Sequence, residues 1–560
     1  MAALRTFPLC SPSFYLGYHP FLMPAQSPES RDQPGSLLQA LQGTSRARVF
    51  GLTFDDLVRY FFAGNASVAI VVLALIMIFL LKEGAGFFGQ NQENISIYRK
   101  AGLEYVDLMR RPVQDFQILK RAVGKLRLAR LNAMLAAGKP LEDASVALES
   151  FDAWESELGR SVREAQGLVS DLTEAASAIK TKAQIAADQV ERKEMLLRAG
   201  KQSEADTVVV QEIDFQQELR VLTGTRPQWV EAAADFDQKL QSAIGAGRAS
   251  TWAKGDAAME KLFGRMESFL KDLRAVDGRL TSWRWDAPVK FREAVVGFLF
   301  GTEWLTASFW QDWYGMLPLL SGSMLVSLIA MTLAVPLALG AAIYTTEVAN
   351  RAERAWIKPY IEFISAIPSV VLGLFGIAVL GSAVRSFSQW EVLSWVPGFP
   401  MSERLNSLTA GCLLALMSIP TIFSLAEDAL VNVPRHLKEA SFALGATRLQ
   451  TLVRVLVPAA LSGIISAILL GFGRVIGETM VVLLCAGNRI QIPDFSDGLG
   501  AIFQPVHTMT GIIAQEMGEV ASGSIHYRAL FMVGIVLFVI SLVINFFAQK
   551  VVRNFKLSIG

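Results

Sequence analysis

Long apolar runs separated by polar segments are the clearest pattern along the chain. The first run covers residues 66–81 and is extended backward by Tyr60, Phe61 and Phe62. About 20 apolar residues span the hydrocarbon core of a bilayer. Five further runs of near that length follow a long gap, at 317–344, 361–380, 408–425, 459–485 and 529–548. The pattern predicts an all-α polytopic membrane protein with about six transmembrane helices.

Basic residues in the short loops predict the orientation of these helices, because Lys and Arg gather in cytoplasmic loops. They lie in two loops and in the C-terminal tail: Arg351, Arg354, Lys358, Arg435, Lys438, Arg448, Arg454, Lys550, Arg553 and Lys556. All fall on one side if the chain starts inside and crosses six times, so we expect both termini in the cytoplasm. Residues 1–58 show no periodicity and contain several prolines. They are expected to form a flexible tail before a first transmembrane helix at 59–83.

Residues 84–306 differ from the rest in composition and predict an extracytoplasmic α-helical insert. They are rich in Ala, Glu, Lys, Leu and Gln, with breaks expected at 138–140, 224–227 and 245–255. Apolar residues recur at alternating steps of three and four, which is a heptad pattern typical of coiled coils. The two series are Phe151, Trp154, Leu158, Val162, Ala165, Val169, Leu172, Ala176 and Ile179, and Met259, Leu262, Met266, Phe269, Leu273, Val276 and Leu280. We expect a helical hairpin or small bundle whose two ends lie close together.

Composition and charge argue against several classes of function. Of 560 residues, 52% are hydrophobic and 18% are charged, which fits a membrane protein with a sizeable soluble part. The formal net charge of +1 argues against a nucleic-acid partner. The three cysteines and four histidines are dispersed, so neither a disulfide framework nor a metal site is expected. A catalytic domain is the alternative for the insert, but it shows no cluster of His, Cys or carboxylates at catalytic spacing.

Two charged residues stand inside the apolar run 459–485. Arg474 and Glu478 belong to Gly471-Phe-Gly-Arg-Val-Ile-Gly-Glu-Thr479. A charge at the centre of a membrane helix costs roughly 2.5–3.5 kcal/mol on insertion scales, so such residues mark a functional site by default. Their spacing of four puts them on one face of a helix, where they can neutralise each other. A structural ion pair locking two helices is the alternative.

The predicted cytoplasmic loop 431–458 carries a recognisable pattern. It reads Lys438-Glu-Ala-Ser-Phe-Ala-Leu-Gly445 and continues to Val455-Leu-Val-Pro458. This is similar to the EAA loop of ABC-importer permeases, with Ser441 in the third position of the motif. The resemblance implies a short helix that docks on a separate ATPase, with Lys438, Glu439, Ala440 and Gly445 as coupling residues. Gly445 suits a tight turn between two short helices. An ordinary amphipathic loop is the alternative.

Energy for transport must come from another subunit. The pattern Gly-x4-Gly-Lys-Ser/Thr, which cradles nucleotide phosphates, occurs nowhere in the chain. We therefore expect a transporter subunit that is not itself an enzyme and holds no cofactor, with ATP used by a partner ATPase.

Within the ABC-importer permeases, the chain resembles the PstC-type subunit of the phosphate-specific importer. The resemblance rests on the segment 471–480 followed by Gly487-Asn488, on Leu408-Thr-Ala-Gly411, on Ala366-Ile-Pro-Ser369, and on the run 510–516. It implies a type I permease core at 307–560 in the bacterial inner membrane. It implies a phosphate path that includes Arg474, Glu478 and Thr479, where an arginine supplies charge-assisted donors. The implied partners are a PstA-type permease, an ATPase dimer, a phosphate-binding protein and the lipid bilayer.

Two rival functions stay open from the sequence. One is a permease for another oxyanion, such as molybdate or sulfate, which shares the EAA loop. The other is a non-transporting sensor or scaffold whose outer helical insert detects envelope components. The long insert is unusual for the PstC-type resemblance and leaves the docking of a binding protein open.

Overall fold

The computed structural model describes residues 54–306, 308, 310–393, 396, 398–401 and 403–556. The chain divides into two units, residues 1–76 and 77–560. In the first unit, the described residues belong to helix α2 (Phe54–Ala85), and their apolar side chains from Tyr60 to Ile76 are exposed. The tail expected at 1–58 lies almost wholly outside the described residues.

The described part of the chain contains six helices long and apolar enough to cross a membrane, as the hydrophobic pattern predicts. They are Val58–Lys100, Leu317–Val348, Ser369–Ser388, Ser407–Val431, Arg448–Ile476 and Ile525–Val551. Together with the nearly all-helical architecture, they confirm the predicted class of all-α polytopic membrane protein.

Two of the predicted spans are interrupted. The run 361–380 is split between α14, which ends at Ile364, and α15, which begins at Ser369. Pro368 has an extended backbone at this break, and proline restricts the preceding residue to extended conformations. The run 459–485 is split at Gly477 between α20 and α21. Apolar composition therefore locates both segments, but single residues inside them decide where the helices end.

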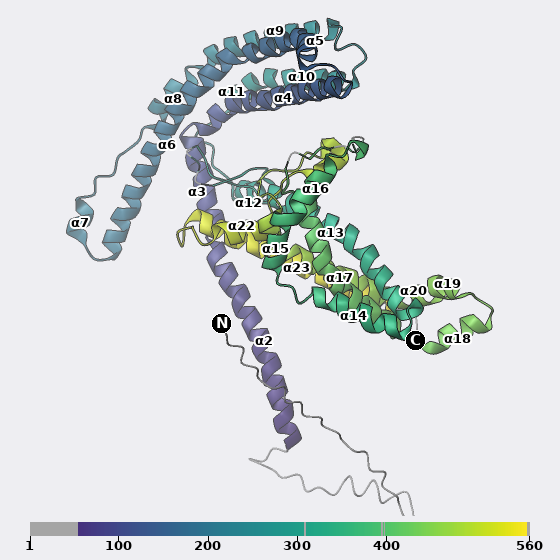
Figure 1. Ribbon diagram of the computed structural model, residues 1–560. Helices are drawn as coiled ribbons and strands as arrows, with labels where there is room; N and C mark the ends of the chain where they lie inside the picture. The colour runs from purple at the N-terminus through teal and green to yellow at the C-terminus, as the bar shows by residue number, and fades with distance from the viewer. Residues whose placement is uncertain are drawn as a thin grey trace, which may run out of the picture. The chain divides into compact units, whose positions relative to one another are not determined.

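The region 307–560, called the core below, packs its long helices against one another (Figure 1). α13 lies against α17, α17 against α20, and α20 against α23. The helices are α13 (Leu317–Ile343), η1 (Tyr344–Val348), α14 (Arg351–Ile364), α15 (Ser369–Phe375), η2 (Gly376–Leu380), α16 (Gly381–Ser388), η3 (Glu391–Leu393), α17 (Ser407–Val431), α18 (Arg435–Ala443), α19 (Arg448–Thr451), η4 (Leu452–Leu456), α20 (Val457–Ile476), α21 (Met480–Cys485), η5 (Phe495–Phe503), α22 (Met509–Glu516) and α23 (Ile525–Lys556). Close approach depends on small residues, since a Cβ on Gly411 would lie 2.5 Å from Ile329 Cγ2.

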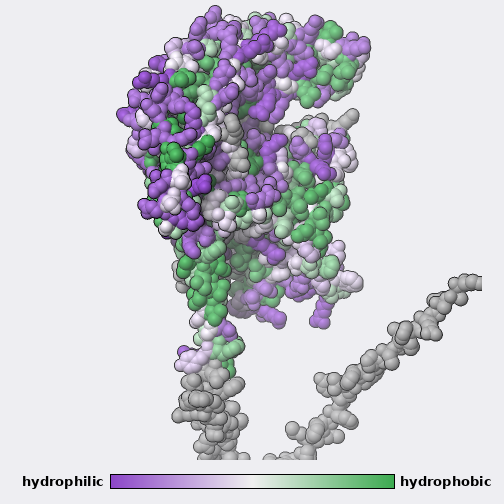
Figure 2. All heavy atoms as spheres, turned by 90° about the vertical axis from the view of Figure 1, so that its left-hand side faces the viewer, coloured by the Kyte–Doolittle hydropathy of each residue, from purple (hydrophilic) through white to green (hydrophobic). Residues whose placement is uncertain are grey.

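The insert is helical throughout most of its length. Its helices are α3 (Phe87–Lys100), α4 (Leu103–Ala136), α5 (Leu141–Ser161), α6 (Arg163–Arg198), α7 (Gln202–Asp206), α8 (Phe215–Thr223), α9 (Arg226–Ala249), α10 (Ala257–Arg274), α11 (Val276–Ser282) and α12 (Phe291–Phe300). Strand β1 (Trp304–Leu305) then pairs antiparallel with β2 (Trp313–Tyr314). Hydrophilic side chains cover most of the insert's face in Figure 2.

Both heptad series of the insert are buried. The series from Phe151 to Ile179 lies on α5 and α6, and the series from Met259 to Leu280 lies on α10 and α11. All of these side chains belong to one apolar core together with residues of α4 and α9. Helices end at the three predicted breaks, including the one before Pro227, which stands in the first turn of α9. The apolar spacing thus gives the buried face of a small helical bundle.

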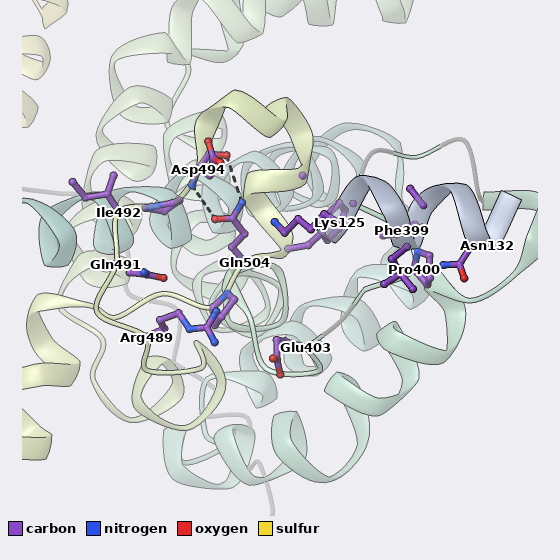
Figure 3. A pocket seen from close by; sticks show the side chains of 17 residues that line it. Lys125, Asn132, Phe399, Pro400, Glu403, Arg489, Gln491, Ile492, Asp494 and Gln504 are labelled. Carbon is purple, nitrogen blue, oxygen red and sulfur yellow. Dashed lines mark hydrogen bonds between the residues drawn. The ribbon is translucent and has the colours of Figure 1, made fainter. Parts of the chain in front are cut away.

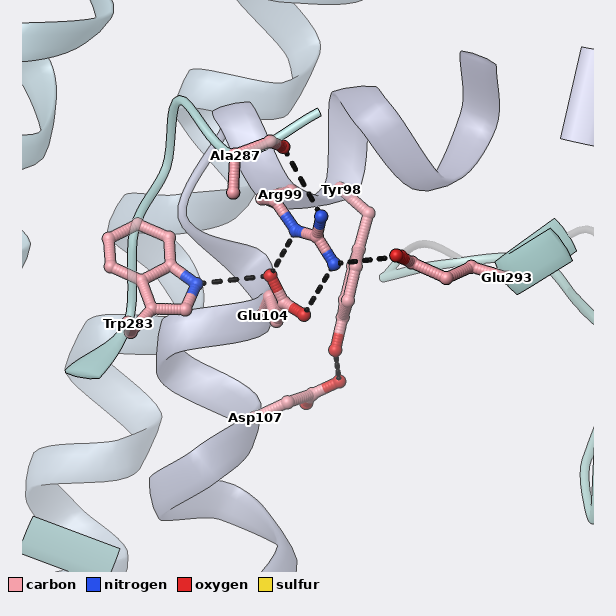
Figure 4. Close-up of polar contacts among 7 residues, drawn as sticks. All are labelled: Tyr98, Arg99, Glu104, Asp107, Trp283, Ala287 and Glu293. Atoms are coloured by element: carbon pink, nitrogen blue, oxygen red, sulfur yellow. Dashed lines mark hydrogen bonds and ion pairs between the residues drawn. The ribbon is translucent and has the colours of Figure 1, made fainter. Parts of the chain in front are cut away.

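A polar clasp joins the two ends of the insert (Figure 4). Arg99 of α3 donates to Glu104 of α4 at 2.8 Å and to the carbonyl of Ala287 at 3.2 Å. Trp283 Nε1 also donates to Glu104, at 3.1 Å. Gln92 Nε2 donates to the carbonyl of Val289 at 2.7 Å. The segments that enter and leave the insert therefore lie side by side, which confirms the expected closeness of its ends.

The N-cap of α10 gives a test of the insert's packing. Asp256 accepts from the N–H groups of Ala258 and Met259 and pairs with Arg130 of α4 at 2.6 Å. The hydrogen bond from Arg130 lowers the pKa of Asp256. We expect Asp256→Ala to lower the free energy of unfolding by about 1 kcal/mol, because it removes the cap of α10. Thermal unfolding of the purified full chain would measure the change.

The control is Asp171→Ala, because Asp171 is exposed on α6 and pairs with none of the described side chains. A lowered folded-state pKa means that the carboxylate stabilises at neutral pH and that this contribution is lost as the pH falls through that pKa. The difference between Asp256→Ala and the wild type should therefore shrink in acid. Equal losses for the two variants at neutral pH would contradict the assignment.

Candidate functional site

The backbone leaves helical geometry inside an apolar, membrane-length segment. α20 ends at Ile476, Gly477 caps it, and α21 begins at Met480. We call residues 477–479 the helix break. Non-helical backbone at membrane depth is tolerated where it is buried in protein or lines a water-filled path. The break is therefore a candidate site on structural grounds, and it contains two of the predicted site residues, Glu478 and Thr479.

Side chains satisfy the polar backbone groups of the helix break. The Glu478 carboxylate accepts from the backbone N–H of Met480 at 3.3 Å, at the start of α21. The Thr510 hydroxyl, on α22, donates to the Glu478 carbonyl at 2.8 Å. Thr479 Oγ1 lies 3.5 Å from the carbonyl of Gly477, at the limit of a hydrogen bond. The break is thus held by its own residues and by α22.

Arg474 and Glu478 are not placed on one helical face. Arg474 lies in the last turn of α20, is exposed, and donates to Thr421 Oγ1 of α17 at 3.2 Å. Glu478 lies beyond the helix end and is half-buried. Among ion pairs of the described residues, none joins the two. The expectation of mutual neutralisation on a helix is therefore wrong, because Gly477 ends the helix between them. Their roles in transport stay predictions.

A cleft too narrow to hold a water molecule adjoins Glu478, and both hydroxyl groups and apolar side chains line it. Ser323 and Ser327 of α13 and Thr508 and Thr510 at the start of α22 border it. Ser323 Oγ accepts from the N–H of Met509 at 2.9 Å, which joins α13 to α22. These four side chains are almost fully buried. Hydroxyls of this kind can donate to an anion or accept from a guanidinium without adding a fixed charge.

A wider cavity of about 900 Å³ lies between loops of the core and α4 of the insert (Figure 3). Arg489, Gln504 and Glu403 line it from the core, and Lys125 and Asn132 line it from α4 of the insert. Gln504 holds the loop together, because its side-chain oxygen accepts from the N–H of Asp494 at 2.8 Å. The cavity mixes both signs of charge, so its shape, rather than its net charge, is its main feature.

The loop 431–458 has the predicted form of two short helices joined by a turn. α18 spans Arg435–Ala443, Gly445 follows with φ of +79°, and α19 begins at Arg448. A φ of this sign favours glycine. Glu439 and Ala440 are exposed on α18, whereas Lys438 is half-buried and pairs with Glu347. The exposed residues are available to a partner, and the lysine is engaged within the chain.

Several contacts of the described residues were missed by the reasoning from sequence. Thr421 and Thr510 contact the site but lie on other helices, far from Arg474 and Glu478 along the chain. Glu427 of α17 is buried and pairs with Lys358 of α14 at 2.9 Å. One signal was available, since a buried carboxylate in an apolar helix requires a partner. In the described ranges, no three His, Cys, Asp or Glu side chains are grouped to hold a metal ion.

Comparison with known proteins gives a family match. Residues 334–557 match the family model described as "Binding-protein-dependent transport system inner membrane component". This range holds α14 to α23, and with them the helix break and the loop 431–458. The insert lies outside it.

Curated relatives match a little under half of the chain. A probable ABC transporter permease protein, YqgH of Bacillus subtilis, is 36% identical over 245 residues, which is 43% of this chain and 74% of the relative. The phosphate transport system permease protein PstC of Pasteurella multocida is 32% identical over 280 residues, 49% of this chain and 83% of the relative. A solved inward-facing conformation of the MetNI methionine ABC transporter is 20% identical and covers 43% of this chain and 94% of that one, at a TM-score of 0.31.

Two glycines near Arg474 give a matched test of the packing around the helix break. A Cβ on Gly471 would lie 2.6 Å from Ile422 Cγ1 of α17, whereas a Cβ on Gly473 meets nothing within 4 Å. We expect Gly471→Ala to destabilise the fold by about 1–3 kcal/mol through overpacking. Gly473→Ala should be neutral or slightly stabilising, because alanine favours the helix. Thermal unfolding in detergent measures both, and equal effects would contradict the close α17–α20 contact.

Proposed function

Because the chain belongs to the PstC-type family of ABC-importer permeases, we propose that it forms part of the membrane path for inorganic phosphate. Relatives such as the phosphate transport system permease protein PstC of Pasteurella multocida support this substrate. The observation that carries the proposal is the helix break with Arg474 beside it. A guanidinium that forms no ion pair with another described residue, next to non-helical backbone and inside an apolar segment, suits an anion that must shed water as it crosses.

The chemistry of the break fits a site that binds an anion and releases it. Arg474 is exposed and shares a hydrogen bond with the neutral Thr421 hydroxyl, so its charge is available to an oxyanion. Glu478 lies close along the chain but is turned toward the backbone of Met480. A fixed carboxylate near the path opposes tight binding of phosphate. Conduction requires such a balance between entry and exit.

ATP hydrolysis takes place on a separate partner subunit, as in the family of ABC-importer permeases. We infer that α18 docks on that ATPase through its exposed Glu439 and Ala440, with Gly445 shaping the turn. The assembly we propose contains this chain, a PstA-type second permease, an ATPase dimer and an outer phosphate-binding protein, with no cofactor in this chain. The chain is a multi-pass inner-membrane protein, and we place both termini in the cytoplasm and the insert outside.

The insert supports one rival function. It lies outside the matched range 334–557, and its bundle has a core of its own. A sensor of envelope components that signals through a bound ATPase would use such a domain. That rival predicts ATP turnover by the assembled complex without any uptake. Transport of molybdate or sulfate in place of phosphate is the other rival.

The proposed path is tested with Arg474→Gln in the complex reconstituted into vesicles. We expect ATP-dependent uptake of labelled phosphate to fall by at least about tenfold, because a charged hydrogen-bond donor to the anion is lost. Arg385→Gln serves as the control, since Arg385 is an exposed arginine of α16 outside the helix break. Assembly should be intact in both variants, as judged by co-purification. Wild-type uptake by Arg474→Gln would refute the role of this residue.

The proposed coupling is tested with Glu439→Lys. Glu439 is exposed on α18 and forms no ion pair with another described residue. Reversal of its charge at a docking surface places like charges together, which weakens binding of the correct partner. We expect phosphate uptake per ATP hydrolysed to fall several-fold, with the helix itself unchanged. Normal uptake at a normal rate of ATP hydrolysis would show that this residue does not face the ATPase.

A further inference from the structure

The cytoplasmic helix α18 is joined to the ends of two different membrane helices. Resting on the proposed function, we propose that two side-chain contacts, Lys438 with Glu347 and Ser441 with Thr451, make α18 move as one body with α13 and α20. We call these contacts the two ties. They carry movement of the ATPase to the helices that border the site, and each is described below from its residues.

The first tie is an ion pair. The Lys438 ammonium, on α18, contacts the Glu347 carboxylate in η1. η1 continues α13 without a gap, and together they form the span Leu317–Val348. The Glu347 side chain is 18% exposed, so the pair is partly shielded from water. The first tie therefore connects α18 to the cytoplasmic end of a membrane helix, 91 residues away along the chain.

The turn that carries Glu347 is itself braced. The Arg354 guanidinium of α14 donates to the carbonyl of Thr346 at 2.8 Å and also to that of Thr345. Asn350 and Glu353 form a reciprocal capping box at the start of α14. These contacts satisfy carbonyls that the end of the α13 span leaves free. Glu347 therefore stands on a fixed turn, so a force on its carboxylate reaches α13.

The second tie is a pair of hydroxyls. Ser441 Oγ of α18 and Thr451 Oγ1 of α19 are 2.9 Å apart, and both side chains are buried. α19 continues through η4 into α20, and the three form the span Arg448–Ile476. Ser441 is the residue that departs from alanine in the EAA pattern. Its hydroxyl gives this chain a contact that an alanine there could not make.

Both tied helices reach the helix break. α13 contributes Ser323 and Ser327 to the cleft beside Glu478, and α20 carries Arg474 in its last turn. Packed helices transmit displacement because cores are dense and little compressible. A displacement of α18 therefore moves two helices that border the site, α13 and α20, together. A loop with only one of the two ties would move only the helix to which that tie connects it.

The ties are tested by double-mutant cycles in the full reconstituted complex. The measured quantity is phosphate taken up per ATP hydrolysed for Glu347→Gln, Lys438→Gln and the double variant. Coupling between sites is typically worth a factor of about 5 or more. We expect each single variant to lower the ratio about fivefold and the double variant to be no worse than either. Ser441→Ala, Thr451→Val and their double variant should behave likewise, with a smaller loss.

The control is Glu362→Gln, which removes an exposed carboxylate of α14 that forms no ion pair with another described residue. Co-purification of the ATPase is measured for every variant. Multiplicative losses in the double variants, or unchanged ratios in the single ones, would overturn the ties. Loss of ATPase binding by Lys438→Gln alone would also overturn the first tie, because the lysine would then serve the partner and not Glu347.

A second readout separates failure of the ties from failure of the phosphate function. Ser327→Cys places a thiol in the cleft, and its labelling by a small water-soluble thiol reagent is followed with and without ATP, with the unsubstituted chain as baseline. If the wild type takes up no phosphate, the proposed function is wrong. The ties then stand if ATP changes the labelling of Ser327→Cys and the Glu347→Gln variant abolishes that change. They fall if the variant leaves the change intact.

Discussion

The constraint on which the site depends is that a chain inside a membrane cannot leave its helix without new partners for its backbone. An unsatisfied backbone group in hydrocarbon costs several kcal/mol. At the helix break two hydrogen bonds offset this cost. The Met480 N–H donates to the Glu478 carboxylate, and the Thr510 hydroxyl donates to the Glu478 carbonyl. α22 is therefore part of the site, and the hydroxyl-lined cleft beside Glu478 follows from its position.

The same arrangement separates the charge that meets the anion from the charge that holds the backbone. Arg474 remains on the helix, where its side-chain hydrogen bond among the described residues goes to the neutral Thr421, while Glu478 is occupied within the turn. A direct ion pair between them would give up the arginine's charge to an internal partner. The two charged residues of α18 differ in the same way, since Lys438 forms an ion pair with Glu347 within the chain and Glu439 is exposed. At each site one charged side chain is therefore available to another molecule: Arg474 to the anion and Glu439 to the proposed ATPase.

The sequence could predict the six membrane helices, the buried faces of the insert and the form of the cytoplasmic loop, because each is a repeated pattern. It could not predict the ends of helices within apolar runs, where Pro368 or Gly477 decides. For that reason it placed Arg474 and Glu478 on one helical face. It also missed Thr421, Thr510 and Glu347, since contacts between distant helices leave no local signal. Ser441 stood out as a departure from a motif, but its partner appears only in the fold.

The most direct test of the central claim is uptake of labelled phosphate into vesicles that hold the wild-type chain with its second permease, ATPase and binding protein. The account predicts accumulation that requires ATP and that excess sulfate or molybdate does not compete. Uptake competed by either oxyanion would assign the path to another substrate. ATP hydrolysis with no accumulation of any of the three anions would contradict a transport role for the helix break.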